Sequence, residues 1–93
     1  MEEQFIAAWM QARESAQRMG VRLRPMEPED AMKQAHRCLD GHRESDGFGI
    51  LADKGHLELS LEALVTDKRY TQLFTDEEVN NALSRLLAAG FYG

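Results

Sequence analysis

The segment that begins at Thr75 carries the signals that start, sustain and end an α-helix, and it constrains the fold more than any other part of the chain. Thr75 and Glu78 form a capping-box pattern, in which the threonine hydroxyl accepts from the third amide while the glutamate reaches back to the cap. Gly90 stands where a helix end needs a positive φ, and Phe91 can fold back on Leu86 after such a cap. Between these ends runs a broad apolar stripe at helical spacing, formed by Val79, Ala82, Leu83, Leu86 and Leu87. The sequence therefore predicts an amphipathic helix here.

A second amphipathic helix is predicted over residues 2–19, with Gly20 as its C-terminal cap. Its apolar stripe is narrow, at spacings of 4, 3, 4 and 3 residues, and consists of Phe5, Trp9, Ala12, Ala16 and Met19. Such a stripe is typical of a helix that packs against another chain. We therefore take these residues, together with Phe91 and Tyr92, as candidate interaction residues. The alternative is that the aromatic residues fill one small core.

The middle of the chain gives shorter and less regular patterns. Residues 27–30 read Glu-Pro-Glu-Asp, which predicts the start of a helix that continues to about Asp40 and stops at Gly41. Residues 46–49 read Asp-Gly-Phe-Gly, which indicates a turn or a close backbone approach. Residues 56–65 favour a helix, and the alternative is a small β-hairpin that pairs 48–52 with 56–60.

These patterns together define the expected architecture. The length of 93 residues suits one compact domain, and no internal repeat or linker divides it. One more turn or short helix is expected between Thr66 and Phe74. We expect a mostly α single domain of four to five helices over residues 1–93, with the hairpin near 48–60 as the alternative.

The charge is unevenly distributed along the chain. The formal charge is −5, and residues 44–93 carry all of it, because residues 1–43 are neutral overall. Within the neutral half, basic residues gather at Arg13, Arg18, Arg22 and Arg24. This asymmetry favours electrostatically guided pairing with a partner or with a second copy. Nucleic acid is disfavoured, because phosphates need a basic face and the balance here is acidic.

The composition also bears on location. One cysteine forms no internal disulfide, and the acidic start differs from the basic leader of a signal peptide. The longest apolar run, residues 5–10, is six residues long, well short of the roughly 20 that span a bilayer. We therefore expect a cytoplasmic protein without membrane contact.

The clearest group of chemically versatile side chains consists of His36, Cys38, Asp40 and His42, with His56 farther on. A zinc site needs about four converging ligands, and on this helix Cys38 points away from His36. No base or anion-stabilising pocket is indicated for Cys38 as a nucleophile. No phosphate-binding loop, Ser-His-Asp arrangement or HExxH pattern occurs in the sequence. We therefore expect neither an enzyme nor a bound metal or cofactor.

One local resemblance concerns residues 75–92, which read Thr-Asp-Glu-Glu-Val-Asn-Asn-Ala-Leu-Ser-Arg-Leu-Leu-Ala-Ala-Gly-Phe-Tyr. This segment is similar to the recognition helix of winged-helix regulators, in which an Ala-Leu-x-x-Leu core precedes a glycine and an apolar residue. The resemblance implies a helix-turn-helix-like scaffold. The segment departs from that family in its acidic residues, Asp76, Glu77 and Glu78, which would repel phosphates, whereas only Arg85 is basic.

Two functional hypotheses follow. The first is a small non-enzymatic regulatory or adaptor-type protein that acts through protein–protein contacts, with homodimer formation as one form of it. The second is a helix-turn-helix-like nucleic-acid-binding regulator, in which the phosphate contacts would be Arg13, Arg18, Arg22 and Arg24.

Overall fold

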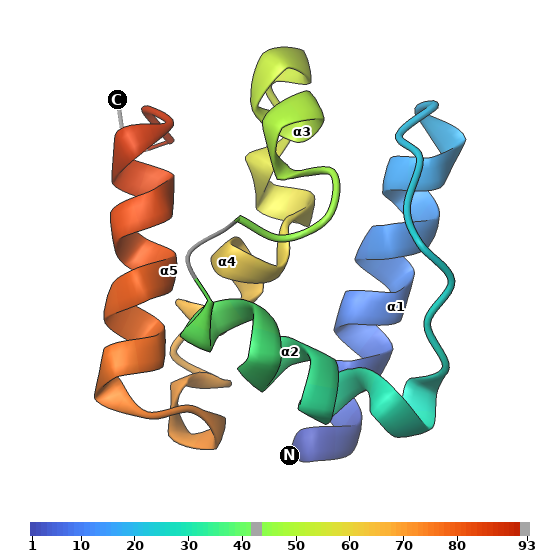
Figure 1. Cartoon of the computed structure of the whole chain (residues 1–93). Helices are drawn as coiled ribbons and strands as arrows, with labels where there is room; N and C mark the ends of the chain where they lie inside the picture. The colour runs from blue at the N-terminus through green and yellow to red at the C-terminus, as the bar shows by residue number, and fades with distance from the viewer. Residues whose placement is uncertain (42–43, 92–93) are drawn as a thin grey trace.

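A computed structural model describes residues 1–41 and 44–91, and in this part of the chain every regular element is helical (Figure 1). The α-helices are α1 (Glu2–Arg18), α2 (Ala31–Asp40), α3 (Phe48–Lys54), α4 (Leu61–Val65) and α5 (Asp76–Ala88). Three single 3₁₀ turns connect them: η1 (Pro28–Asp30), η2 (Leu57–Leu59) and η3 (Thr71–Leu73). The prediction of a mostly α fold with four to five helices is confirmed.

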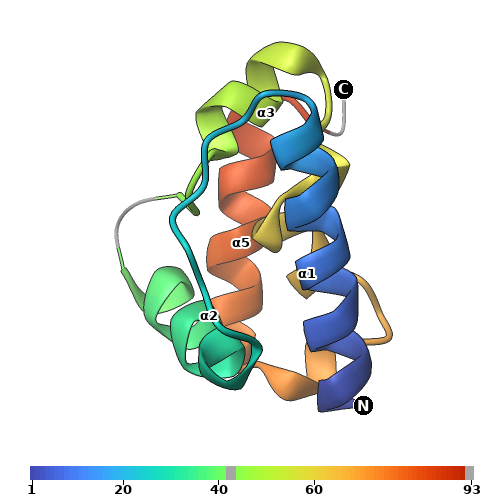
Figure 2. The ribbon, with the colours of Figure 1, turned by 90° about the vertical axis from the view of Figure 1, so that its right-hand side faces the viewer.

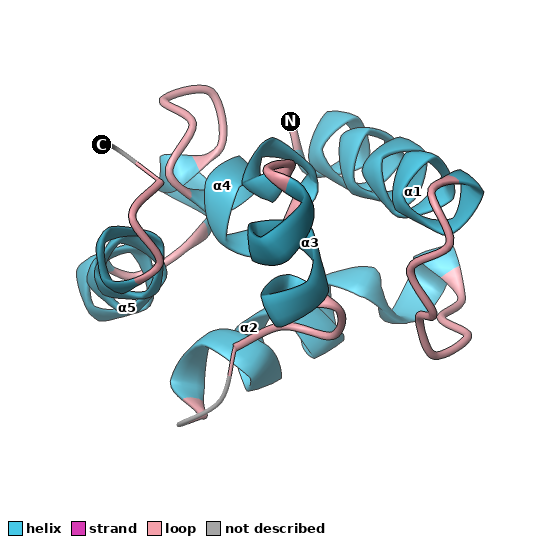
Figure 3. Ribbon diagram, turned by 90° about the horizontal axis from the view of Figure 1, so that it is seen from above, coloured by secondary structure: helices cyan, strands magenta, loops and turns pink. Residues whose placement is uncertain are grey.

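The shortest α-helix lies at the centre of the molecule. α1 and α5 stand on opposite sides of α4, and they run in the same direction (Figures 1 and 3). α2 crosses one end of the molecule and packs against both α1 and α5. The segment 21–27 has no regular structure and runs back along the molecule from the end of α1 toward α2 (Figure 2).

The core consists of two apolar clusters, and α1 contributes to both of them. In the larger cluster, Phe5 lies edge-to-face with Tyr70 and Phe74, at ring-centroid distances of 5.4 and 5.2 Å. In the smaller cluster, Ala16 of α1 packs with Leu86 of α5 and with apolar residues of α3 and η2. Each cluster brings together residues that are distant in sequence.

The alternative β-hairpin is wrong for this chain, because residues 48–52 lie in α3 and residues 57–59 form η2. Gly47 and Gly55 adopt left-handed conformations that cap α3 at both ends. The favoured helix over 56–65 is correct only in part, because Ser60 is extended and divides η2 from α4. The Ser60 hydroxyl accepts from the Ala63 amide and so starts α4 as its N-cap.

The predicted helix ends are confirmed. The capping box is complete, with Thr75 and Glu78 each accepting from the backbone amide of the other. Gly90 has φ +77°, and the Phe91 amide donates to the Leu86 carbonyl at 3.0 Å, which closes the helix end. The close approach predicted for 46–49 is also present, because a Cβ on Gly47 would lie 2.8 Å from side-chain atoms of the 21–27 segment.

Candidate functional site

The apolar stripe of α1, predicted as an interaction surface, forms part of the chain's own core. Phe5 is 0% exposed and Trp9 is 6% exposed, and Ala12 and Ala16 are also buried. These side chains pack against α2, α4 and η2 and do not form an exposed surface. The alternative that they fill the core is the one observed, because α1 lies against three elements of its own chain.

The other candidate interaction residues lie elsewhere. Met19, at the end of the stripe, is exposed, and so is Phe91, which follows the end of α5. Tyr92 lies outside the described residues. The predicted group of interaction residues is therefore not brought together on one surface.

The arginine cluster is partly used in contacts within the chain. The Arg13 guanidinium lies 6.0 Å from the centroid of the Trp9 ring and donates to the Arg24 carbonyl. Burial lowers the pKa of Arg13, although nearby Asp46 opposes that shift. Arg18 forms an exposed ion pair with Glu14 at 2.6 Å. Of the four predicted phosphate contacts, Arg18, Arg22 and Arg24 are exposed, and Arg13 is half-buried.

A cleft of about 630 Å³ lies between α1, α2 and the segment 21–27, with Trp9, Arg13 and Cys38 in its lining. Its volume is in the range of small-molecule sites. Two contacts link parts of its lining: the Arg24 amide donates to the Asp46 carboxylate at 2.6 Å, and Arg13 donates to the Arg24 carbonyl. Both hydrogen bonds involve the Arg24 backbone, so they hold the 21–27 segment in place.

The thiol in this cleft is poorly suited to nucleophilic chemistry. Burial raises the pKa of Cys38, and the neighbouring Glu62 carboxylate raises it further, against the opposing effect of Arg85. A thiol with a raised pKa stays protonated near neutral pH, and the thiolate is the reactive form. The arrangement therefore does not activate Cys38.

His36 and His56 each lie next to a carboxylate. His36 Nδ1 lies 2.7 Å from Glu78 Oε2, and His56 Nδ1 lies 3.4 Å from Glu58 Oε1. Over residues 1–41 and 44–91, no group of three or more His, Cys, Asp or Glu side chains is arranged to hold a metal ion. His42, the remaining member of the predicted cluster, lies outside the described residues.

The His36–Glu78 pair and its neighbour Asp40 have perturbed carboxyl groups. Burial acts to raise the pKa of Glu78, but the hydrogen bonds from the Thr75 amide and from His36 outweigh it, so the pKa is lowered. Desolvation and the adjacent Glu78 carboxylate raise the pKa of Asp40. These contacts join α2 to the start of α5. This structural role is a sufficient explanation for the His36–Glu78 pair.

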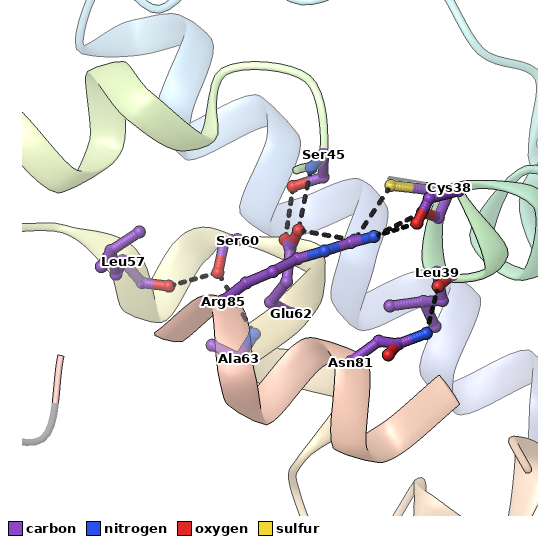
Figure 4. A network of polar contacts seen from close by, with 10 residues as sticks. Cys38, Leu39, Ser45, Leu57, Ser60, Glu62, Ala63, Asn81 and Arg85 are labelled. Carbon is purple, nitrogen blue, oxygen red and sulfur yellow. Dashed lines mark hydrogen bonds and ion pairs between the residues drawn. The ribbon is translucent and has the colours of Figure 1, made fainter. Parts of the chain in front are cut away.

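A second buried carboxylate joins three helices. The fully buried Glu62 accepts from the Ser45 amide at 2.8 Å and the Ser45 hydroxyl at 2.5 Å, and Arg85 Nη1 lies 3.3 Å from it (Figure 4). Arg85 Nη2 also donates to the carbonyls of Cys38 and Gly41. The network therefore fixes the end of α2 against α4 and α5.

The surface that stands out for exposed apolar side chains is the side of α5 that faces away from the core. Leu87 is 57% exposed and Leu83 is 36% exposed, and they lie four residues apart. Asp76 and Asn80, both exposed, continue the same line toward the start of the helix. We call these four residues the outer face of α5. It passes from acidic to apolar along the helix.

A shallow hollow adjoins the acidic end of this face. Its volume is about 460 Å³, and it lies between η3 and the first turns of α5. Asp76 and Asn80 of the outer face are part of its lining, together with Thr71, Gln72, Phe74 and Val79. The outer face therefore borders a depression at one end and projects two leucines at the other.

Comparison with known proteins adds no assignment. No protein-family model, no curated protein and no solved structure matches this chain. Within the described ranges, none of the helices has the length and apolar character needed to cross a membrane.

The apolar pattern of α5 is related to the outer face. The apolar stripe of α5, from Ala82 to Leu87 around the helix, is about 140° wide at 100° per residue. Neighbouring elements bury Ala82 and Leu86 on one side of it and leave Leu83 and Leu87 exposed. The Glu62–Arg85 pair has no corresponding pattern in the sequence.

Proposed function

We propose that this chain is a small, non-enzymatic, cytoplasmic protein of regulatory or adaptor type, and that it acts by binding another polypeptide through the outer face of α5. The observation that carries the proposal is the pair of exposed leucines, Leu83 and Leu87, on a helix whose other side is buried. Adjacent exposed leucines are more typical of a contact surface than single scattered ones.

The polar residues support the same proposal. The buried carboxylates of Glu62 and Glu78 are engaged by Arg85 and His36, and the contacts join helices to one another. No buried side-chain nitrogen or oxygen among the described residues is without a hydrogen-bond partner. Groups used in this way stabilise the fold, which leaves the exposed surface as the place where the protein meets its partners.

Photo-crosslinking in cells that produce the protein tests the proposal. A photoreactive amino acid at position 87 is expected to yield an adduct with another polypeptide, whereas the same residue at Asp53, exposed on α3, yields none. The double variant Leu83→Ser, Leu87→Ser is expected to keep its helical circular dichroism spectrum and to lose the partner. Equal adducts from positions 87 and 53, or no adduct from position 87, would contradict the proposal. An adduct of two copies would make the partner a second copy.

A further inference from the structure

We infer that the partner segment bound by the outer face of α5 is an amphipathic helix with one apolar end and one basic end, running antiparallel to α5. This inference rests on the proposed function and specifies the chemistry of the partner. Three arguments support it. The outer face changes from acidic to apolar along α5, the only Lys or Arg of that helix is Arg85, and helices favour cations in their last turn.

The outer face changes character along its length. Asp76 lies in the first turn of α5, and the exposed Glu77 follows it, about 100° farther around the helix and at the edge of the outer face. Leu83 and Leu87 follow Asp76 by 7 and 11 residues, which places them about 10 and about 16 Å farther along the helix axis. A partner helix in contact with the whole face therefore needs apolar side chains at one end and cations two to three turns away.

No cation of α5 is available to neutralise these acids. Arg85 is the only Lys or Arg between Asp76 and Ala88, and its guanidinium points into the Glu62 network. Its side chain is 12% exposed. The acidic end of the outer face therefore complements a positive group brought by the partner.

The direction of the partner helix follows from electrostatics. Lys and Arg are most favourable in the last turn of a helix, near the negative end of its dipole. A partner that places its last turn beside Asp76 and Glu77 runs antiparallel to α5, and its apolar first half then meets Leu83 and Leu87. Antiparallel packing also aligns the two helix dipoles favourably.

A second copy of α5 does not fit this surface. Antiparallel pairing of two outer faces would place Asp76 of each copy against Leu87 of the other. The carboxylate would lose water without gaining a cation, which is unfavourable. The charge order therefore favours a different polypeptide over self-pairing through this face.

Fluorescence anisotropy with a designed probe tests the inference. The probe is a labelled synthetic helix of about 15 residues, with leucines at helical spacing in its first half and three lysines in its last turns. The matched control peptide has glutamates in place of the lysines. The full chain is expected to bind the basic probe and not the acidic one.

Variants of the chain locate the contact. Asp76→Asn with Glu77→Gln is expected to weaken binding of the basic probe about fivefold, because exposed ion pairs contribute little each. Leu87→Ser is expected to weaken it about tenfold through lost apolar contact. Ile50→Ser is the control, because Ile50 is exposed on α3 and lies outside the outer face. It is expected to leave affinity unchanged, and circular dichroism checks that each variant is folded.

The outcomes separate this inference from the proposed function. Equal binding of the two peptides, or unchanged binding by the Asp76→Asn, Glu77→Gln variant, would overturn the inference. Failure of the basic probe to bind, alongside a partner adduct from position 87, would overturn it and leave the proposed function standing. Failure of both experiments would overturn both. Self-association that Leu87→Ser abolishes would identify a second copy as the occupant and overturn the inference.

Discussion

α1 and α5 are the two longest helices of the structure, and they differ in how much of their apolar surface is buried. α1 buries Phe5, Trp9, Ala12 and Ala16, whereas α5 buries Ala82 and Leu86 and leaves two leucines exposed. α1 packs against α2, α4 and η2, whereas α5 packs mainly against α4 and α2. The comparison teaches that the apolar pattern of a helix shows which side can be buried, while its neighbours decide how much of that side is covered.

The difference follows from the widths of the two stripes. The stripe of α1 is narrow, so the elements packed against that one side of the helix cover it. The stripe of α5 is about 140° wide, which exceeds what one buried side accommodates in this fold. Apolar surface beyond that limit stays exposed, and this surplus gives α5 its outer face.

The largest expected effect tests the burial of α1. Phe5→Ala is expected to lower the free energy of unfolding by about 3–5 kcal/mol, because a fully buried aromatic ring leaves a cavity. Urea denaturation monitored by circular dichroism measures it. A loss below about 1 kcal/mol would mean that α1 is only loosely covered, and would remove the contrast with α5.

The second effect tests the inner side of α5. Arg85→Met is expected to lower the free energy of unfolding by about 3 kcal/mol, because the fully buried Glu62 then lacks its cation. Arg69→Met is the matched control, because Arg69 pairs with Asp67 at the surface, and a loss under about 1 kcal/mol is expected there. Equal losses would show that the burial of Glu62 has no energetic consequence.

The third effect tests the connection that follows α1. Gly47→Ala is expected to cost about 2 kcal/mol, because its φ is +79° and an added Cβ would lie 2.8 Å from atoms of Val21 and Leu23. Gly49→Ala is the control, since its Cβ meets nothing within 4 Å, and no loss is expected. Thermal denaturation of both variants measures the difference. A similar melting temperature for both would contradict the close approach.

The fourth effect tests the first turn of α5 through its pH dependence. The pKa of Glu78 lies below its ordinary value of 4.5, so its contribution to stability is present above pH 4.5 and is lost as the pH falls through the folded-state value. Glu78→Gln is expected to cost about 1 kcal/mol at pH 7 and to flatten the acid limb of the stability curve. Urea denaturation between pH 2 and 7 measures it. An unchanged acid limb would contradict the role of Glu78.

The smallest effect tests the outer side of α5. Leu87→Ser is expected to change the free energy of unfolding by no more than about 0.5 kcal/mol, because the side chain is exposed and outside both core clusters. Urea denaturation measures it alongside Phe5→Ala. A loss as large as that of Phe5→Ala would mean that α5 has no outer face.

Local features of the fold were predictable from the sequence, whereas tertiary features were not. The capping box at Thr75 and the caps at Gly20 and Gly90 depend on adjacent residues, and the structure confirms them. Over 48–60, the left-handed caps at Gly47 and Gly55 decide for a helix, and the sequence shows these positions only as turn residues. For short segments, tertiary context outweighs propensity.

The candidate site was less predictable than the fold. The aromatic residues of α1 could fill a core or contact a partner, and only the positions of α2 and α4 decide between these roles. The ion pair of Glu62 with Arg85 joins residues 23 positions apart, and neither helix pattern contains it. The sequence places Leu83 and Leu87 in one apolar stripe with Ala82 and Leu86, and it does not show which of these side chains are exposed.

The central position of α4 has a consequence for how the chain acquires its structure. α4 has five residues, whereas isolated helices shorter than about 12–15 residues are marginal in water. It can therefore persist only while α1 and α5 hold it from both sides, so neither half of the polypeptide has a stable interior by itself. Denaturation should accordingly be all-or-none, and fragments divided at Gly55 should become ordered only when they are recombined.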